Sequence, residues 1–166
     1  MVPEEWHKQN KLYNSLIRNV FHHDDWQERA EAARKLGYLK DKRATNLLCK
    51  ALRKEEDHLV VNRIIEALGR IGDPRATMRI IEKLKEELDK FKGDKFRIKY
   101  IIESLTRLKD KRALPYIGPF LRSSDEDLKK LAKEAFDIIE PEWEKILEKE
   151  KTKDKTIESI FKEKYP

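Results

Sequence analysis

The sequence of 166 residues has one cysteine, five glycines and no long apolar run. Because Cys49 has no partner within the chain, a disulfide framework is excluded and a reducing, cytoplasmic setting is expected. No segment approaches the roughly 18 consecutive apolar residues that a transmembrane helix needs. The first six residues also lack the basic and then apolar order of a signal peptide. We therefore expect a soluble, cytoplasmic protein without a membrane partner.

The scarcity of glycine also bears on catalysis and cofactor binding. The five glycines are scattered singly, at Gly37, Gly69, Gly72, Gly93 and Gly118. They form no glycine-rich loop of the kind that cradles phosphate groups. Ser123 and Ser124 have no basic partner in their sequence context, so no nucleophile is indicated. We expect a protein that is not an enzyme and that carries no cofactor.

Charge, by contrast, is abundant. Charged residues make up 42% of the chain, and 38 basic side chains exceed 32 acidic ones by a net charge of +6. Such a small excess does not by itself indicate a nucleic-acid-binding protein. The interleaving of Lys and Glu is typical of thermophilic proteins, which is an association with source rather than with function.

The same six-residue turn pattern occurs three times in the chain, at residues 39–44, 71–76 and 108–113. Each copy has an apolar residue, then an Asp two positions later, then Arg-Ala. The three Asp residues are Asp41, Asp73 and Asp110, spaced by 32 and 37 residues. An apolar residue that closes one amphipathic helix and an Asp that starts the next predict repeated helical hairpins.

The apolar spacing predicts a single all-α domain over residues 1–166. A capping helix at 3–22 precedes repeats at 25–56, 57–92, 93–124 and 125–150, and a charged segment with a short helix follows at 151–166. The five extra residues of the second repeat are predicted to lengthen its second helix, with Leu88 and Phe91 on the buried stripe. Trp26 is expected on the buried stripe of its helix. Pro119 should kink or shorten the second helix of the third repeat.

Residues 32–44 and 66–76, with the period near 32, resemble HEAT-like repeats of the phycobilisome-lyase type. The resemblance implies a right-handed α-solenoid of about four hairpins with terminal caps, in which the second helices line a concave face. In that family the turn Asp and the following Arg usually bond across neighbouring repeats. The resemblance therefore implies scaffold roles for a set of turn residues: Asp41, Arg43, Asp73, Arg75, Asp110 and Arg112.

Three kinds of catalytic or metal site were weighed against this architecture. His22-His23-Asp24-Asp25 has metal-ligand residue types, but adjacent side chains on a turn point apart and an Asp is needed as a helix cap. HEAT-like di-iron hydroxylases use His-Glu pairs, and no His precedes a Glu here. HEAT-like DNA glycosylases use Trp and Asp side chains, but Trp26 is expected to be buried. We therefore predict no metal and no catalytic site.

The second helices leave a set of side chains off their buried stripes, and these are the predicted partner-binding residues: Asn46, Lys50, Arg53, Met78, Arg79, Glu82, Lys85, Tyr116 and Arg122. They predict a non-enzymatic scaffold, a monomer or weak homodimer, that binds a protein or peptide in the concave groove. Tyr116 is the strongest single candidate because aromatic side chains serve as anchors. The alternative is nucleic-acid backbone binding through the row Arg53, Lys85 and Arg122, or glycosylase-like DNA binding. The same row is also explained by cations that complement helix C-termini.

Overall fold

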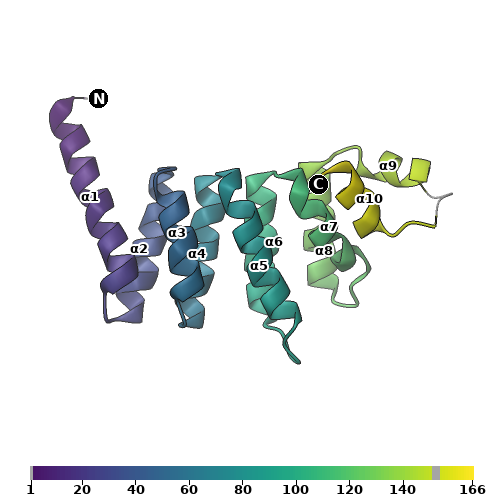
Figure 1. Cartoon of the computed structure of the whole chain (residues 1–166), viewed down its shortest axis with the longest axis horizontal. Coiled ribbons are helices and arrows are strands. Elements are labelled where there is room, and N and C mark those ends of the chain that lie inside the picture. Colours follow the sequence, from purple (N-terminus) through teal and green to yellow (C-terminus); the bar gives the residue numbers. More distant parts are fainter. Residues whose placement is uncertain (1, 151–153) are drawn as a thin grey trace. The chain divides into compact units, whose positions relative to one another are not determined.

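The computed structural model describes residues 2–150 and 154–166 (Figure 1). These residues form α-helices and short 3-10 helices and include no β-strand, so the predicted all-α class is confirmed. No helix in this part of the chain is long and apolar enough to cross a membrane. The chain divides into two compact units, Met1–Ala76 and Thr77–Pro166, here named unit 1 and unit 2. The single domain and the right-handed superhelix stay predictions.

Unit 1 is a stack of antiparallel helices around an aliphatic core. Its elements are α1 (Pro3–His22), α2 (Trp26–Leu39), α3 (Ala44–Lys54), α4 (His58–Ile71) and the 3-10 turn η1 (Pro74–Ala76). The predicted stripe Val61, Ile64, Ile65 and Leu68 is buried in α4. A Cβ atom on Gly37 would lie 2.9 Å from the Cα of Ala67, so glycine allows close packing between α2 and α4.

The start of each leading helix is fixed by an aspartate. Asp25, Asp57, Asp94 and Asp125 each accept a hydrogen bond from a backbone N–H in the first turn of α2, α4, α6 and α8 respectively. Such a cap satisfies a donor that has no partner within the helix and contributes about 1 kcal/mol. The aspartates of the sequence therefore set the repeat boundaries.

In each of the three repeated turns the Asp forms an ion pair with the Arg two residues later. Arg75 pairs with Asp73 of its own turn at 2.6 Å, and the same pairing joins Arg43 to Asp41 and Arg112 to Asp110. An Arg two residues after the Asp thus folds back onto it, and this pairing lies within one turn.

Asp73 and Arg75 also bond to the preceding repeat of unit 1, as the resemblance implies for these turn residues. The hydroxyl of Thr45 donates to the buried carboxylate of Asp73 at 3.0 Å, and Arg75 also donates to the carbonyl of Lys42 at 3.1 Å. The hydrogen bond from Arg75 is the main cause that lowers the pKa of Asp73 to about 2. The scaffold role of this turn is thus carried by one carboxylate that serves two repeats.

Unit 2 has second helices of unequal length, from 12 residues in α5 to 4 in α7. Its elements are α5 (Thr77–Leu88), α6 (Lys95–Leu108), η2 (Lys111–Ala113), α7 (Leu114–Ile117), η3 (Gly118–Arg122), α8 (Glu126–Ile139), α9 (Trp143–Glu150) and α10 (Ile157–Lys164). Pro119 falls in η3, where the α-helix has already given way to 3-10 geometry, as its missing N–H requires. Residues 151–153 of the predicted charged segment lie outside the described residues.

The extra residues of the second repeat form a loop, so the prediction of a longer helix is wrong. Helix α5 ends at Leu88, and Phe91 is 99% exposed. The buried carboxylate of Glu87 accepts hydrogen bonds from the backbone N–H of Asp94 at 2.5 Å and from Lys90 at 2.8 Å. These bonds close the loop between α5 and α6 and outweigh the helical spacing of Leu88 and Phe91.

The last helix docks on unit 2. Phe161 of α10 is fully buried, and its ring packs edge to face against Phe136 of α8 at 5.2 Å. Trp143 packs on the other side of this cluster, 5.3 Å from Phe136. The apolar pattern Ile157, Ile160 and Phe161 therefore serves the core of unit 2, where α10 contacts α7, η3 and α9.

Candidate functional site

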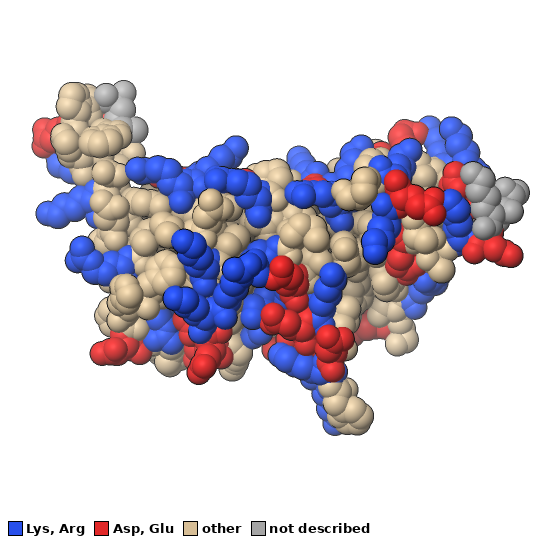
Figure 2. Space-filling view, viewed as in Figure 1, with Lys and Arg blue, Asp and Glu red and all other residues tan. Residues whose placement is uncertain are grey.

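The predicted partner-binding residues of unit 1 lie on α3. Asn46, Lys50 and Arg53 are all exposed there. Helix α3 contains no acidic residue, and Lys54 adds a further exposed cation at its C-terminus. On the face shown in Figure 2, basic side chains gather over α3. This helix therefore offers a local basic surface.

The predicted residues of α5 in unit 2 are partly engaged with one another. Arg79 forms an ion pair with Glu82, one turn later on the same helix. Lys85 stands over the ring of Tyr116, with its Nζ 5.1 Å from the ring centroid. Figure 2 shows acidic and basic side chains interleaved over α5. This surface is therefore close to neutral, unlike that of α3.

An apolar pocket of about 250 Å³ lies beside Tyr116 in unit 2. Its lining residues are Met78, Arg112, Pro115, Tyr116, Lys162, Tyr165 and Pro166. Met78 comes from the start of α5, Pro115 and Tyr116 come from α7, and Tyr165 follows α10. The structure thus brings together two of the predicted binding residues, Met78 and Tyr116, with a C-terminal wall.

Tyr165 is held in that wall by a buried carboxylate. Its hydroxyl donates to Glu140, which also accepts from Lys111 at 2.8 Å. Burial raises the pKa of Glu140, but the hydrogen bonds from Lys111 and Tyr165 outweigh burial, so its pKa lies below the ordinary value. Glu140 is therefore ionised at neutral pH and fixes the ring that closes the pocket.

Two members of the predicted basic row of Arg53, Lys85 and Arg122 already contact other side chains in unit 2. Arg122 pairs with Glu158 of α10 at 2.9 Å, and Lys85 lies over Tyr116 as described above. Arg53 is exposed on α3. The sequence could not show this difference, because Glu158 reaches Arg122 only after α10 has docked.

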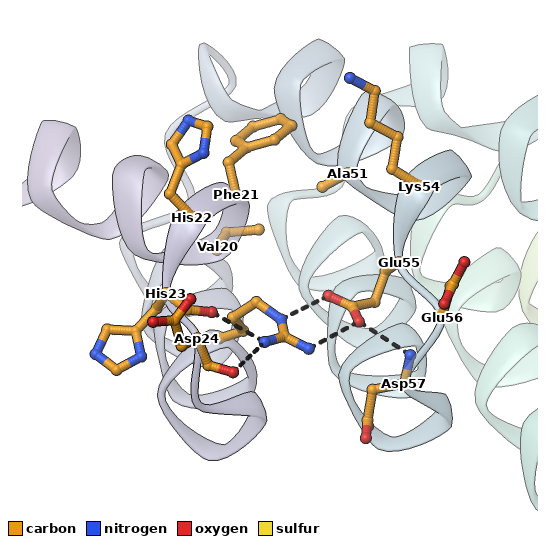
Figure 3. A pocket seen from close by; sticks show the side chains of 11 residues that line it. Val20, Phe21, His22, His23, Asp24, Ala51, Lys54, Glu55, Glu56 and Asp57 are labelled. Carbon is orange, nitrogen blue, oxygen red and sulfur yellow. Dashed lines mark hydrogen bonds and ion pairs between the residues drawn. The ribbon is translucent and has the colours of Figure 1, made fainter.

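A larger and more polar cavity, of about 400 Å³, lies in unit 1 between the end of α1 and the end of α3 (Figure 3). Arg29 is at its centre and makes two hydrogen bonds to the carboxylate of Glu55, at 2.9 and 3.1 Å. The same guanidinium donates to the backbone carbonyls of His23 and Asp24, both at 2.9 Å. The polar centre of this cavity is thus satisfied from within the protein.

The His22-His23-Asp24-Asp25 segment borders this cavity. Figure 3 shows the rings of His22 and His23 directed away from the carboxylate of Glu55. Asp25 caps α2 through the N–H of Gln27 at 2.8 Å, and its own N–H donates to Nδ1 of His23 at 3.1 Å. Among residues 2–150 and 154–166, no three His, Cys, Asp or Glu side chains are arranged to hold a metal ion.

The two tryptophans considered for DNA binding have different environments. Trp26 is 39% exposed at the start of α2, so its expected burial is wrong; as the first residue of the helix it lies beyond the packed part of the stripe. Trp143 is buried, and its indole N–H donates to Asp137 at 2.8 Å. Trp143 therefore has a packing role in unit 2.

Sequence reasoning missed Pro115, Lys162 and Tyr165 as parts of one pocket. The sequence predicts a short helix within residues 151–166, but it does not show which surface that helix covers. The one usable signal was the apolar pattern of residues 157–161, which indicated a helix that must cover an apolar surface.

Residues 14–92 match the family of HEAT repeats. Over these residues, just under half of the chain, the sequence is similar to HEAT repeats. It is also 37% identical over 98 residues to the bilin biosynthesis protein PecE of Mastigocladus laminosus. That match covers 59% of this chain and 34% of the relative, so the chain spans about a third of the protein it resembles. The predicted resemblance to HEAT-like repeats is confirmed.

Proposed function

We propose that the chain is an interaction module that holds a protein partner through the apolar pocket of unit 2, with Tyr116 as the central contact. HEAT repeats are consistent with a protein-interaction scaffold. The observation that carries the proposal is the exposed apolar pocket, which combines Met78, Pro115 and Tyr116 on one surface. An apolar surface of this kind gains free energy when a partner removes it from water.

The proposal includes no catalytic step and no pigment. The name of PecE ties that protein to bilin biosynthesis. We do not extend that role to this chain, because the match covers only 34% of PecE.

The proposal is tested by affinity purification from lysate of the source organism. The intact chain and its Tyr116→Ala variant serve as baits, with Tyr100→Ala as a control that removes a similarly half-buried tyrosine from α6. We expect one set of proteins to be retained by the intact chain and by the control but not by Tyr116→Ala. Raising salt from about 0.05 to about 0.5 M should leave part of the retention in place, since an apolar anchor is not screened although charges at the rim are. Equal retention by all three baits would contradict the proposal.

A second candidate function is favoured by the basic surface of α3 in unit 1. Lys50, Arg53 and Lys54 are exposed on a helix without acidic residues. If these three cations contact phosphates, affinity for generic duplex or single-stranded nucleic acid should fall with salt at a log-log slope of about −2 to −3. Arg53→Glu should lower that slope by about 1. Salt-sensitive binding that survives Tyr116→Ala would favour this candidate over the first.

A further inference from the structure

We propose that the unit 2 pocket recognises an acidic amphipathic segment of its protein partner, in which one large apolar side chain enters the pocket and a neighbouring carboxylate meets Lys162. This inference rests on the proposed function and names the chemistry of the partner. It follows from the size of the pocket, the charges at its rim and the way in which α10 binds to the adjoining surface.

The size of the pocket suits one side chain. Its volume of about 250 Å³ is bounded by Met78, Pro115 and the rings of Tyr116 and Tyr165. Each ring already has a lysine over one face, Lys85 at 5.1 Å and Lys111 at 5.2 Å. The cations are thus stacked on the aromatic walls and leave the apolar interior to a Leu, Met, Phe or Trp side chain.

The charges at the rim of the pocket favour a partner segment with a single carboxylate. Arg112 pairs with Asp110 at 2.6 Å, and Lys111 pairs with Glu140 at 2.8 Å. Lys162 is exposed and has no ion-pair partner within residues 2–150 and 154–166. One such cation complements one acidic side chain, whereas a nucleic-acid strand would need several cations in a row.

Helix α10 shows the same binding mode on the surface next to the pocket. Its Phe161 is buried against unit 2, while Glu158, on the same helix, pairs with Arg122 at 2.9 Å. The repeats of unit 2 therefore already hold one helix by an apolar side chain combined with a carboxylate. A partner segment of similar chemistry would extend this arrangement across the pocket.

A second copy of the chain fits the pocket poorly. Among the residues that the structure describes, Phe91 is the most exposed large apolar side chain, and it lies between Lys90 and Lys92. Insertion of Phe91 into the pocket would bring these lysines toward Lys162, and like charges at an interface are unfavourable. The rim therefore favours an acidic partner over self-association.

In the experiment, a phage-displayed library of random twelve-residue peptides is screened for binding to the immobilised full chain. We expect the enriched peptides to carry a large apolar residue within about four positions of an Asp or Glu, one helical turn. The enriched peptides are then synthesised, and their affinities for the full chain are measured by fluorescence anisotropy. Tyr116→Ala should abolish binding.

Lys162→Glu supplies the decisive variant. It should weaken acidic peptides about tenfold and move the selected consensus toward Lys and Arg, because the sign of the rim charge is reversed. Lys130→Glu makes the same charge change at an exposed position of α8 that does not line the pocket, and it should leave affinities unchanged.

Every other result overturns the inference. Peptides that need Tyr116 but show no acidic preference and ignore Lys162→Glu would overturn the partner chemistry while leaving the proposed function in place. Peptides that bind Tyr116→Ala equally well, no enriched peptide at all, or competition for the pocket by an oligonucleotide would each overturn the inference. Failure of the proposed function itself is read separately, from the affinity purification with Tyr116→Ala.

Discussion

The larger cavity of unit 1 and the smaller pocket of unit 2 differ in how their polar groups are satisfied. In unit 1 the centre of a cavity of about 400 Å³ is taken by Arg29, which uses its donors on Glu55 and on two backbone carbonyls. In unit 2 a pocket of about 250 Å³ is lined by the buried Pro115, the half-buried Tyr116 and Met78, which is 40% exposed. Volume alone is therefore a poor guide to a binding site, and the state of the lining groups is a better one.

The largest effect is expected from removing the ring that docks α10, the helix beside which the C-terminal wall of the unit 2 pocket lies. Phe161→Ala should lower the free energy of unfolding by about 3 to 5 kcal/mol, because it removes a fully buried ring from the cluster with Phe136 and leaves a cavity. Urea unfolding followed by circular dichroism measures the change. A loss below about 1 kcal/mol would show that α10 is not part of the core of unit 2.

A smaller effect is expected from breaking the centre of the unit 1 cavity. Arg29→Met should cost about 2 to 3 kcal/mol, because it leaves the carboxylate of Glu55, whose side chain is 9% exposed, without its partner. The residual exposure of Arg29, 18%, keeps the cost below that of a fully buried pair. The double variant Arg29→Met with Glu55→Leu should recover most of this loss in the same urea measurement. Additive losses would mean that the two side chains do not act as a pair.

The smallest effect concerns Glu140, which supports Tyr165 in the pocket wall. Glu140→Gln should cost about 1 to 2 kcal/mol at pH 7 through the weakened bonds from Lys111 and Tyr165. Because the folded-state pKa of Glu140 lies below its ordinary 4.5, its contribution is present above that pH and is lost as pH falls further. Urea midpoints of the two proteins should therefore converge in acid. A constant difference down to about pH 2 would contradict this account.

Much of the fold could be predicted because the buried stripes are periodic. The four apolar residues of α4 recur in α6 as Ile98, Ile101, Ile102 and Leu105, and both sets are buried. The prediction failed where a local polar group overrides the period. Leu88 and Phe91 keep helical spacing, but the carboxylate of Glu87 closes a loop beyond them. The periodicity of apolar residues does not show that hydrogen bonds to a carboxylate can end the helix.

The candidate site could be predicted only in part, because it joins residues that are distant in the sequence. Tyr116 and Met78 could be predicted because they lie off the buried apolar stripes of the second helices. Tyr165 and Lys162 reach the same pocket through the docking of α10, which depends on the burial of Phe161 in a core assembled from α8 and α9. No local pattern near residue 165 specifies where the helix lies.

The loop between α5 and α6 also bears on how this chain tolerates changes in length. The backbone carbonyl of Glu87 lies 2.7 Å from where a Cβ of Gly93 would be, so the loop is closed tightly at its base while its tip at Phe91 stands clear. Each doubling of a flexible loop adds only about 0.6 kcal/mol of closure entropy. Residues inserted at the tip would leave the packing of α5 on α6 unchanged. The loop is therefore a suitable position for a fluorescent label or an inserted tag, and a repeat can grow there without any shift of its core.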